Sequence, residues 1–161
     1  PARAHVAWAT AGAGAFAAER WTGTVPPAGR AVGLRACSPE SGRVLLASRS
    51  EVRAGEFEPF RAAWSLEEVG STAWKLARSA MGAGAYISRG PKSEWDVAAG
   101  VLLVVEAGGV ATDLEGRPVA LNRRDPSVHG VVAGCPEAHA RLLARARPLP
   151  APRLQRERTE G

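Results

Sequence analysis

The chain has 161 residues, which is enough for one domain with its own hydrophobic core. Hydrophobic residues make up 45% of it and the formal net charge is +5, a composition typical of a globular protein. No apolar stretch reaches the roughly 20 residues that a membrane span needs, and no charged-then-apolar signal segment opens the chain. We therefore expect a cytoplasmic protein with no membrane partner.

The composition also argues against metal-binding cysteines and nucleic-acid binding. Cys37 and Cys135 are far apart in the sequence and form no C-x-x-C pair, so both thiols are expected to be reduced and structural. His5, His129 and His139 show no metal-ligand spacing and are expected to be surface or packing residues. The positive charge comes mainly from scattered arginines, without a recognition-helix pattern or interleaved aromatic side chains. Nucleic acid is therefore not an expected partner.

The N-terminus does not have the form of a translation start. The chain begins with Pro1, and its only methionine is Met81. Either a preceding segment has been removed or the sequence is the downstream part of a longer protein, and we expect the second.

Strands and helices are predicted to alternate along residues 1–146, which favours a layered α/β fold. Alternating apolar residues predict strands, and apolar residues spaced three or four apart predict helices. In chain order we expect a strand over 4–10, a hairpin partner over 11–19, loops around Pro26 and Pro27 that continue to 42, a strand over 43–50, a helix over 56–64, a turn over 65–71, a helix over 72–82, a strand over 83–90, a helix from about Asp96 to Glu106, a strand over 108–116, a strand over 129–134 and a helix over 136–146. Residues 147–161 have no apolar period and are expected to be a disordered tail rich in arginine and proline.

Polar residues collect at two points where a predicted helix begins. The first is Gly70, Ser71 and Thr72, just ahead of a helix that carries Lys75. Helix N-termini offer free N–H groups and a partial positive charge. This junction is therefore either a plain serine N-cap or an anion site completed by the two hydroxyls and the ammonium. The second junction leads to Asp96, which either complements the helix dipole or has a role as a ligand.

The segment SEWDVAAGVLLVVEAGG, residues 93–109, resembles the C-terminal signature of the inositol monophosphatase superfamily, W-D-x-A-A/G-G followed by E-A-G-G. Further upstream, AWATAGAGAF resembles the family's hairpin, SRS its substrate-side strand end, and GSTAWKLARSAMGAGAY its G-S/T helix with the following strand. The resemblance implies a layered αβαβα sugar-phosphatase-like fold and a magnesium-dependent phosphomonoesterase. It covers the C-terminal half only, because the family's upstream glutamate and D-P-x-D-G-T segment do not occur here.

The resemblance assigns roles to individual residues. Asp96 is expected to be the single Mg²⁺ ligand that this half contributes, with the other ligands upstream. Trp95 is expected to pack rather than react, and Glu106 to brace the helix end rather than bind metal. By matching motif positions, substrate contacts are expected at Ser48, Arg49, Gly70, Ser71, Thr72, Lys75, Ser88 and Lys92.

The same resemblance bears on the substrate. SRS and GPKSEWD are similar to the 3'(2'),5'-bisphosphate nucleotidase branch, and Ser88 stands where the inositol-specific branch has a glutamate. Arg89 and Lys92 add positive charge that would suit a doubly phosphorylated nucleotide such as 3'-phosphoadenosine 5'-phosphate. Inositol phosphate, a related sugar phosphate, or a non-catalytic remnant of the fold are the alternatives. The expected partner is a small phosphate ester, and a homodimer is left open.

Overall fold

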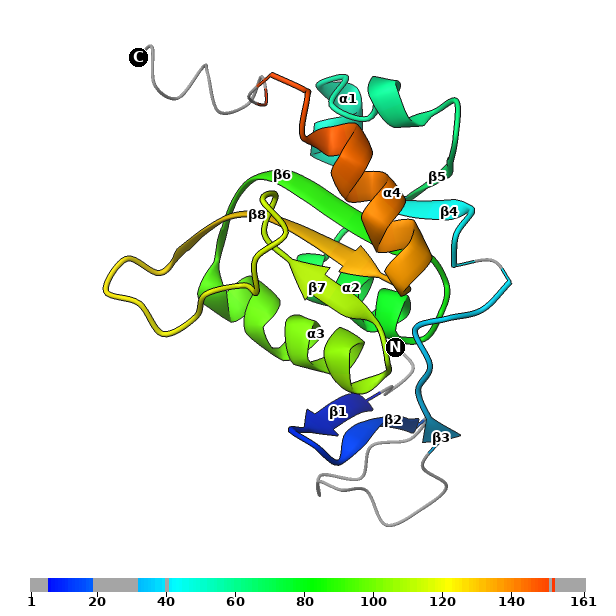
Figure 1. Cartoon of the computed structure of the whole chain (residues 1–161), viewed down its shortest axis with the longest axis vertical. Coiled ribbons are helices and arrows are strands. Elements are labelled where there is room, and N and C mark those ends of the chain that lie inside the picture. The colour runs from blue at the N-terminus through cyan, green and yellow to red at the C-terminus, as the bar shows by residue number, and fades with distance from the viewer. Residues whose placement is uncertain (1–5, 19–31, 40, 151, 153–161) are drawn as a thin grey trace.

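The structure, a computed structural model, describes residues 6–18, 32–39, 41–150 and 152. These residues form two sheets (Figure 1). A small antiparallel sheet, in the order β1-β2-β3, contains β1 (Val6–Thr10), β2 (Gly14–Ala18) and β3 (Val32–Gly33). A larger mixed sheet, in the order β5-β4-β6-β8-β7, contains β4 (Val44–Ala47), β5 (Ser65–Glu68), β6 (Ala85–Ser93), β7 (Val110–Thr112) and β8 (Ser127–Gly134).

The helices pack on both faces of the larger sheet. They are α1 (Arg49–Arg53), α2 (Thr72–Ala80), α3 (Glu94–Glu106) and α4 (Pro136–Ala146), with a 3₁₀ turn at Glu58–Phe60. Successive strand residues point to opposite faces. Tyr86 and Val131 face the core of α2 and α3, whereas Ile87 and Val132 face the core of α4. The small sheet lies beyond α3, so the layers run helix, sheet, helices, sheet (Figure 1), and the layered α/β prediction is confirmed.

Strand direction determines where the helices begin. β4 pairs in parallel with β5 and β6, and β8 lies antiparallel between β6 and β7. The strands β5, β6 and β7 therefore run in the same direction, and α2 and α3 are the crossovers that join them. Both helices must return across the sheet, so both begin at the edge where β4, β5 and β6 end.

Several predicted elements differ from the structure. The loop expected to continue to 42 contains the two-residue strand β3. Residues 49 and 50, expected to end a strand over 43–50, instead begin the short helix α1. The helix expected over 56–64 is only a 3₁₀ turn, in which the N–H groups of Phe60 and Arg61 bond to carbonyls three residues back, and the chain then turns to bury Phe60 and Trp64. The turn expected over 65–71 is largely the edge strand β5, whose two glutamates are exposed. An edge strand tolerates such charges because one of its sides faces no other strand.

Several expectations fall partly or wholly outside the described residues. His5 and the loop at Pro26 and Pro27 lie outside them. Of the predicted tail 147–161, only residues 147–150 and 152 are described, so its disorder stays a prediction. Within the described part of the chain, no helix has the length and apolar character needed to cross a bilayer.

Candidate active site

The starts of α2 and α3 lie together because the two helices pack closely. The contact depends on Gly100 in α3, which faces Leu76 in α2. A methyl group at Gly100 would lie only 2.5 Å from Leu76 Cβ, well inside the usual 3.5–4.0 Å of carbon contacts. The missing side chain therefore lets two predicted polar junctions meet at one edge of the sheet.

The α2 start is capped by Ser71. Its Oγ accepts a hydrogen bond from the Trp74 N–H at 3.2 Å, so the N-cap interpretation of this serine is confirmed. Ser71 and Gly70 are exposed, and Thr72 is half-buried. The guanidinium of Arg49 lies beside Gly70, about 4.0 Å from where a side chain would begin. A cation and an open helix N-terminus are therefore neighbours at this point.

Lys75 lies beneath this surface rather than on it. Its side chain is fully buried, and Nζ donates to Ser48 Oγ at 2.8 Å and to the carbonyls of Val69 and Gly70 at 3.3 Å. Burial lowers the pKa of Lys75, the charge of Glu51 opposes this, and the nearby Lys92 lowers it further. The ammonium thus joins the ends of β4 and β5 and adds positive charge under the α2 start.

Glu51 is a site residue that the sequence analysis missed. It is buried, and its Oε1 accepts from Ser88 Oγ at 2.9 Å and from Lys92 Nζ at 3.2 Å. Its Oε2 has no hydrogen-bond partner among the described residues. The S-x-x-E spacing from Ser48 to Glu51 is that of a capping box and would have predicted a helix start here. In the structure α1 does begin after Ser48, but neither side chain caps it. Ser48 bonds to Lys75 and Glu51 bonds to Ser88.

Tyr86 belongs to the same buried cluster and lies next to Lys75. Its ring centroid is 5.5 Å from Lys75 Nζ. Its buried hydroxyl has no hydrogen-bond partner with good geometry among the residues that the structure describes. Burial raises the pKa of Tyr86 well above its usual range, and the charges of Glu51 and, more weakly, Asp96 add to this, while the hydroxyls of Thr72 and Ser88 oppose it. Asp96 itself is exposed in the first turn of α3.

Across residues 6–18, 32–39, 41–150 and 152, no three His, Cys, Asp or Glu side chains are grouped so that they could hold a metal ion. A phosphoryl-transfer centre with two or more Mg²⁺ ions, each preferring about six oxygen ligands, needs several carboxylates to hold the ions together. Asp96 offers one carboxylate on a solvent-facing helix start. The residues present therefore do not fit a magnesium centre by themselves.

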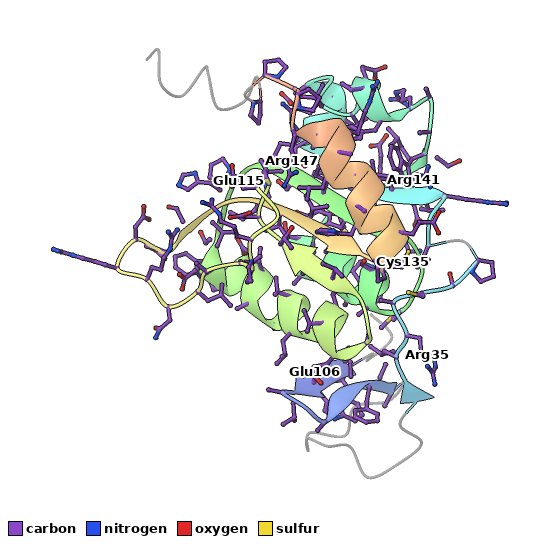
Figure 2. All side chains as sticks on the ribbon, viewed as in Figure 1. Arg35, Glu106, Glu115, Cys135, Arg141 and Arg147 are labelled. Atoms are coloured by element: carbon purple, nitrogen blue, oxygen red, sulfur yellow. The ribbon has the colours of Figure 1, made fainter. Side chains whose placement is uncertain are left out.

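Two other residues of the signature have different outcomes. Trp95 was expected to pack, but its side chain is 73% exposed, so that expectation is wrong for this chain. Glu106 accepts the N–H groups of Gly12 and Gly14, both at 2.9 Å, and lies between the end of α3 and the β1–β2 hairpin (Figure 2). These hydrogen bonds lower the pKa of Glu106. The predicted bracing role is confirmed, although the carboxylate braces the hairpin as well as the helix end.

Glu94 is a second residue that the sequence analysis missed. Its carboxylate accepts the N–H groups of Asn122 at 2.8 Å and Arg123 at 3.1 Å, and its own N–H donates to the Pro126 carbonyl. Asn122 has a positive φ of 59°. Glu94 thereby holds the loop before β8 against the start of α3. The contact joins residues 28 and 29 positions apart, so no local pattern could have predicted it.

A family model described as the inositol monophosphatase family matches residues 1–150. A curated protein, "Probable inositol 1-monophosphatase ImpA" of Mycobacterium tuberculosis, is 49% identical over 49 residues, which is 30% of this chain and 16% of that protein. The inositol monophosphatase of Anabaena (Nostoc) sp. PCC 7120 superposes with a TM-score of 0.65 at 25% identity, covering 89% of this chain and 56% of that one. CysQ from Bacteroides thetaiotaomicron gives a TM-score of 0.60 at 19% identity, covering 77% of this chain and 51% of that one.

These coverages have one common consequence. The chain spans about half the length of the solved structures that it matches, and a smaller part of the curated relative. At 19% identity the likeness to CysQ concerns the fold alone.

Proposed function

Because this chain belongs to the inositol monophosphatase family, we propose that it forms part of a phosphomonoesterase whose substrate phosphate lies against the starts of α2 and α3. One observation carries the proposal. The exposed Asp96 and the Ser71-capped start of α2 lie at the same edge of the sheet, above the buried Lys75 and beside Arg49. A dianionic phosphate is stabilised by helix N–H groups and nearby cations.

Each residue has a defined part in this proposal. Thr72 and the first N–H groups of α2 would bind phosphate oxygens, and Arg49 would add a charge-assisted contact at the rim. Lys75 would act from below by fixing Ser48 and the Gly70 carbonyl, so it is a positioning residue rather than a direct ligand. Ser88 and Lys92 both donate hydrogen bonds to Glu51 Oε1. They would therefore form the floor of the site rather than contact the phosphate directly.

Magnesium dependence is part of the same proposal. Where Mg²⁺ is bound, it can neutralise a phosphate and lower the pKa of a bound water. Asp96 would supply one carboxylate oxygen, and the remaining ligands would come from a segment like the family's D-P-x-D-G-T, which this sequence does not contain. We therefore propose that the chain alone has no magnesium-dependent phosphatase activity.

For the substrate, we propose a 3'(2'),5'-bisphosphate nucleotide. It is supported by Ser88 at the position of the inositol branch's glutamate, by the charge of Arg49 beside the α2 start and by that of Lys75 beneath it. Inositol phosphate is the second candidate, and one observation favours it. Lys92 pairs with Glu51 at 3.2 Å and Arg89 pairs with Glu56 at 3.0 Å, so the two cations expected to attract a second phosphate are largely neutralised.

The test of the activity is Asp96→Asn in a protein that carries both the present chain and the metal-binding segment. If Asp96 is a ligand, both metal affinity and kcat fall, while the melting temperature without Mg²⁺ changes little. Glu137→Gln is the matched control, because it removes an exposed carboxylate from the first turn of α4, on the other side of the sheet. Near-normal turnover and an unchanged magnesium titration in the Asp96 variant would reduce this residue to a helix-start acid.

The substrate is tested by comparing kcat/KM for 3'-phosphoadenosine 5'-phosphate and inositol 1-phosphate on the same protein. The nucleotide proposal requires the higher value for the bisphosphate. A higher value for inositol phosphate would favour the second candidate. Absence of turnover with any phosphate ester, in a protein that binds Mg²⁺, would support the non-catalytic alternative.

A further inference from the structure

The fold brings together two cysteines that are distant in the sequence. A methyl group at Gly109 would lie 2.8 Å from Ala36 Cβ and also 2.8 Å from the Gly134 carbonyl oxygen. Ala36 and Gly134 therefore flank the same point. The residues that follow them are Cys37 and Cys135, which places both at the junction of the segment after β3 with the start of α4.

Backbone and packing contacts fix both sides of this junction. The Ala36 N–H donates to the Ala107 carbonyl at 3.0 Å, and the Ala36 side chain is fully buried. Ser38 Oγ donates to the Gly82 carbonyl at 2.6 Å, so the segment is anchored on each side of Cys37. Cys135 is the N-cap residue of α4, at the base of that helix (Figure 2).

The two thiols are free and lie at the same junction. Cys37 is exposed, whereas Cys135 is buried. Burial, the charge of a Cys135 thiolate, and a side-chain hydrogen bond to Cys135 all raise the pKa of Cys37. Because Ala36 and Gly134 flank the same point, the residues that follow them bring the two thiols to one junction, and the exposed member can meet an oxidant from solution.

We propose that Cys37 and Cys135 form a reversible thiol–disulfide modification site that ties the segment after β3 to the start of α4. The oxidant is a peroxide. The Cys37 thiolate attacks one peroxide oxygen and breaks the O–O bond, which gives a sulfenic acid and hydroxide. The Cys135 thiolate then attacks the Cys37 sulfur, the S–S bond forms, and a second hydroxide leaves. In total two thiols and one hydrogen peroxide give one disulfide and two waters.

The geometry also predicts how the reaction depends on pH and what it does to the protein. The thiolate is the nucleophile, and the pKa of Cys37 is raised, so cross-linking becomes faster as the pH rises above neutral. The new bond closes a loop of roughly 100 residues, which reduces the entropy of the unfolded chain and should raise Tm by on the order of 10 °C in the absence of strain. The crosslink joins the small sheet's connecting segment to the far face of the larger sheet.

The experiment treats the purified protein with hydrogen peroxide, blocks the remaining thiols by alkylation, and analyses non-reduced proteolytic peptides by mass spectrometry. The expected product is an intramolecular Cys37–Cys135 peptide pair, with loss of both alkylation sites, recovery of both on reduction, and a monomeric chain on a non-reducing gel. Melting curves before and after oxidation measure the expected rise in Tm.

Cys37→Ser is the principal control, because this residue is exposed and its replacement should leave folding intact. Cys37→Ser should abolish both the crosslink and the rise in Tm. After peroxide treatment and denaturation of this variant, the Cys135 thiol should still react with the alkylating reagent. Cys135→Ser provides the reciprocal control. The proposal is overturned if both wild-type thiols are still alkylated after peroxide, if Cys37 proceeds to a sulfinic acid, or if the disulfide joins two chains.

Discussion

Replacing Gly100 by alanine should destabilise the protein by forcing α2 and α3 apart. The added methyl carbon would lie 2.5 Å from Leu76 Cβ, 2.7 Å from Cδ1 and 3.1 Å from Cγ. Cδ1 could swing away by a change of rotamer, but Cβ is fixed by the α2 backbone. Leu76 is fully buried, so it has no free space to enter. The helices would have to separate by about 1 Å to restore a normal carbon contact.

Two opposing terms set the size of the effect. Overpacking a well-filled core costs about 1–3 kcal/mol, and the fixed Cβ contact favours the upper end of that range. Alanine gains about 1 kcal/mol over glycine through helix propensity. The expected net loss is therefore about 2 kcal/mol, which corresponds to a fall in Tm of about 4–8 °C for a chain of this size.

Urea denaturation and thermal melts of Gly100→Ala measure this loss, with Gly90→Ala as the matched control. Gly90 lies in β6, has no heavy atom within 4 Å of the added position, and should change stability by no more than about 0.5 kcal/mol. If Gly100→Ala is as stable as wild type or more stable, the close approach of α2 and α3 does not hold these helix starts together, and the geometric basis of the candidate site is removed.

Three further substitutions test the supporting contacts. Glu106→Gln should speed hydrogen exchange of the β1–β2 hairpin at neutral pH, and unchanged hairpin protection would contradict the bracing role. Backbone N–H groups lower the pKa of Glu106 in the folded protein. The contribution of the wild-type carboxylate to stability is therefore complete above the ordinary glutamate pKa and disappears as the pH falls through the lowered folded value. Burial lowers the pKa of His139, so the stability of the wild-type protein should fall as the pH drops below about 6.5. His139→Gln should flatten this pH dependence, whereas replacement of the exposed His129 by Gln should leave it in place. Urea titrations of both variants at several pH values measure the difference. Glu94→Ala should accelerate exchange at the loop before β8 more than Glu137→Ala does, and equal exchange in both variants would show that Glu94 does not hold the loop.

The long periodic segments of the fold could be predicted from the sequence. The helices α2 and α4 were predicted because each has one buried side and therefore a strong apolar period. The helix α3 and the strands β4, β6 and β8 were predicted as apolar runs bounded by turn or polar residues. α1 and β5 were missed for the opposite reason. α1 has only five residues, and β5 carries two exposed glutamates at a sheet edge, so neither has a clear period.

The candidate site was predictable only where its residues belong to local motifs. Ser71 lies directly before a periodic helix, and its capping role follows from that position. Lys75 would normally be placed on the solvent side of a helix, and its burial depends on three acceptors from β4 and β5. The contacts of Glu51 and the placing of Cys37 and Cys135 at one junction depend in the same way on chain segments that only the folded topology brings together.

The Glu106 contact has a consequence for the order of folding. The β1–β2 hairpin can form from local contacts in about 1–10 μs, whereas Glu106 reaches it across 92 and 94 positions of the chain. Closing so long a loop is entropically costly until other contacts reward it. During synthesis the hairpin segment leaves the ribosome well before α3, so its apolar side has no partner until that helix arrives. The glycine-rich turn that receives the Glu106 carboxylate is thus a docking point for a step that has to wait for α3, and slow docking there would expose the hairpin's edges to pairing with other chains.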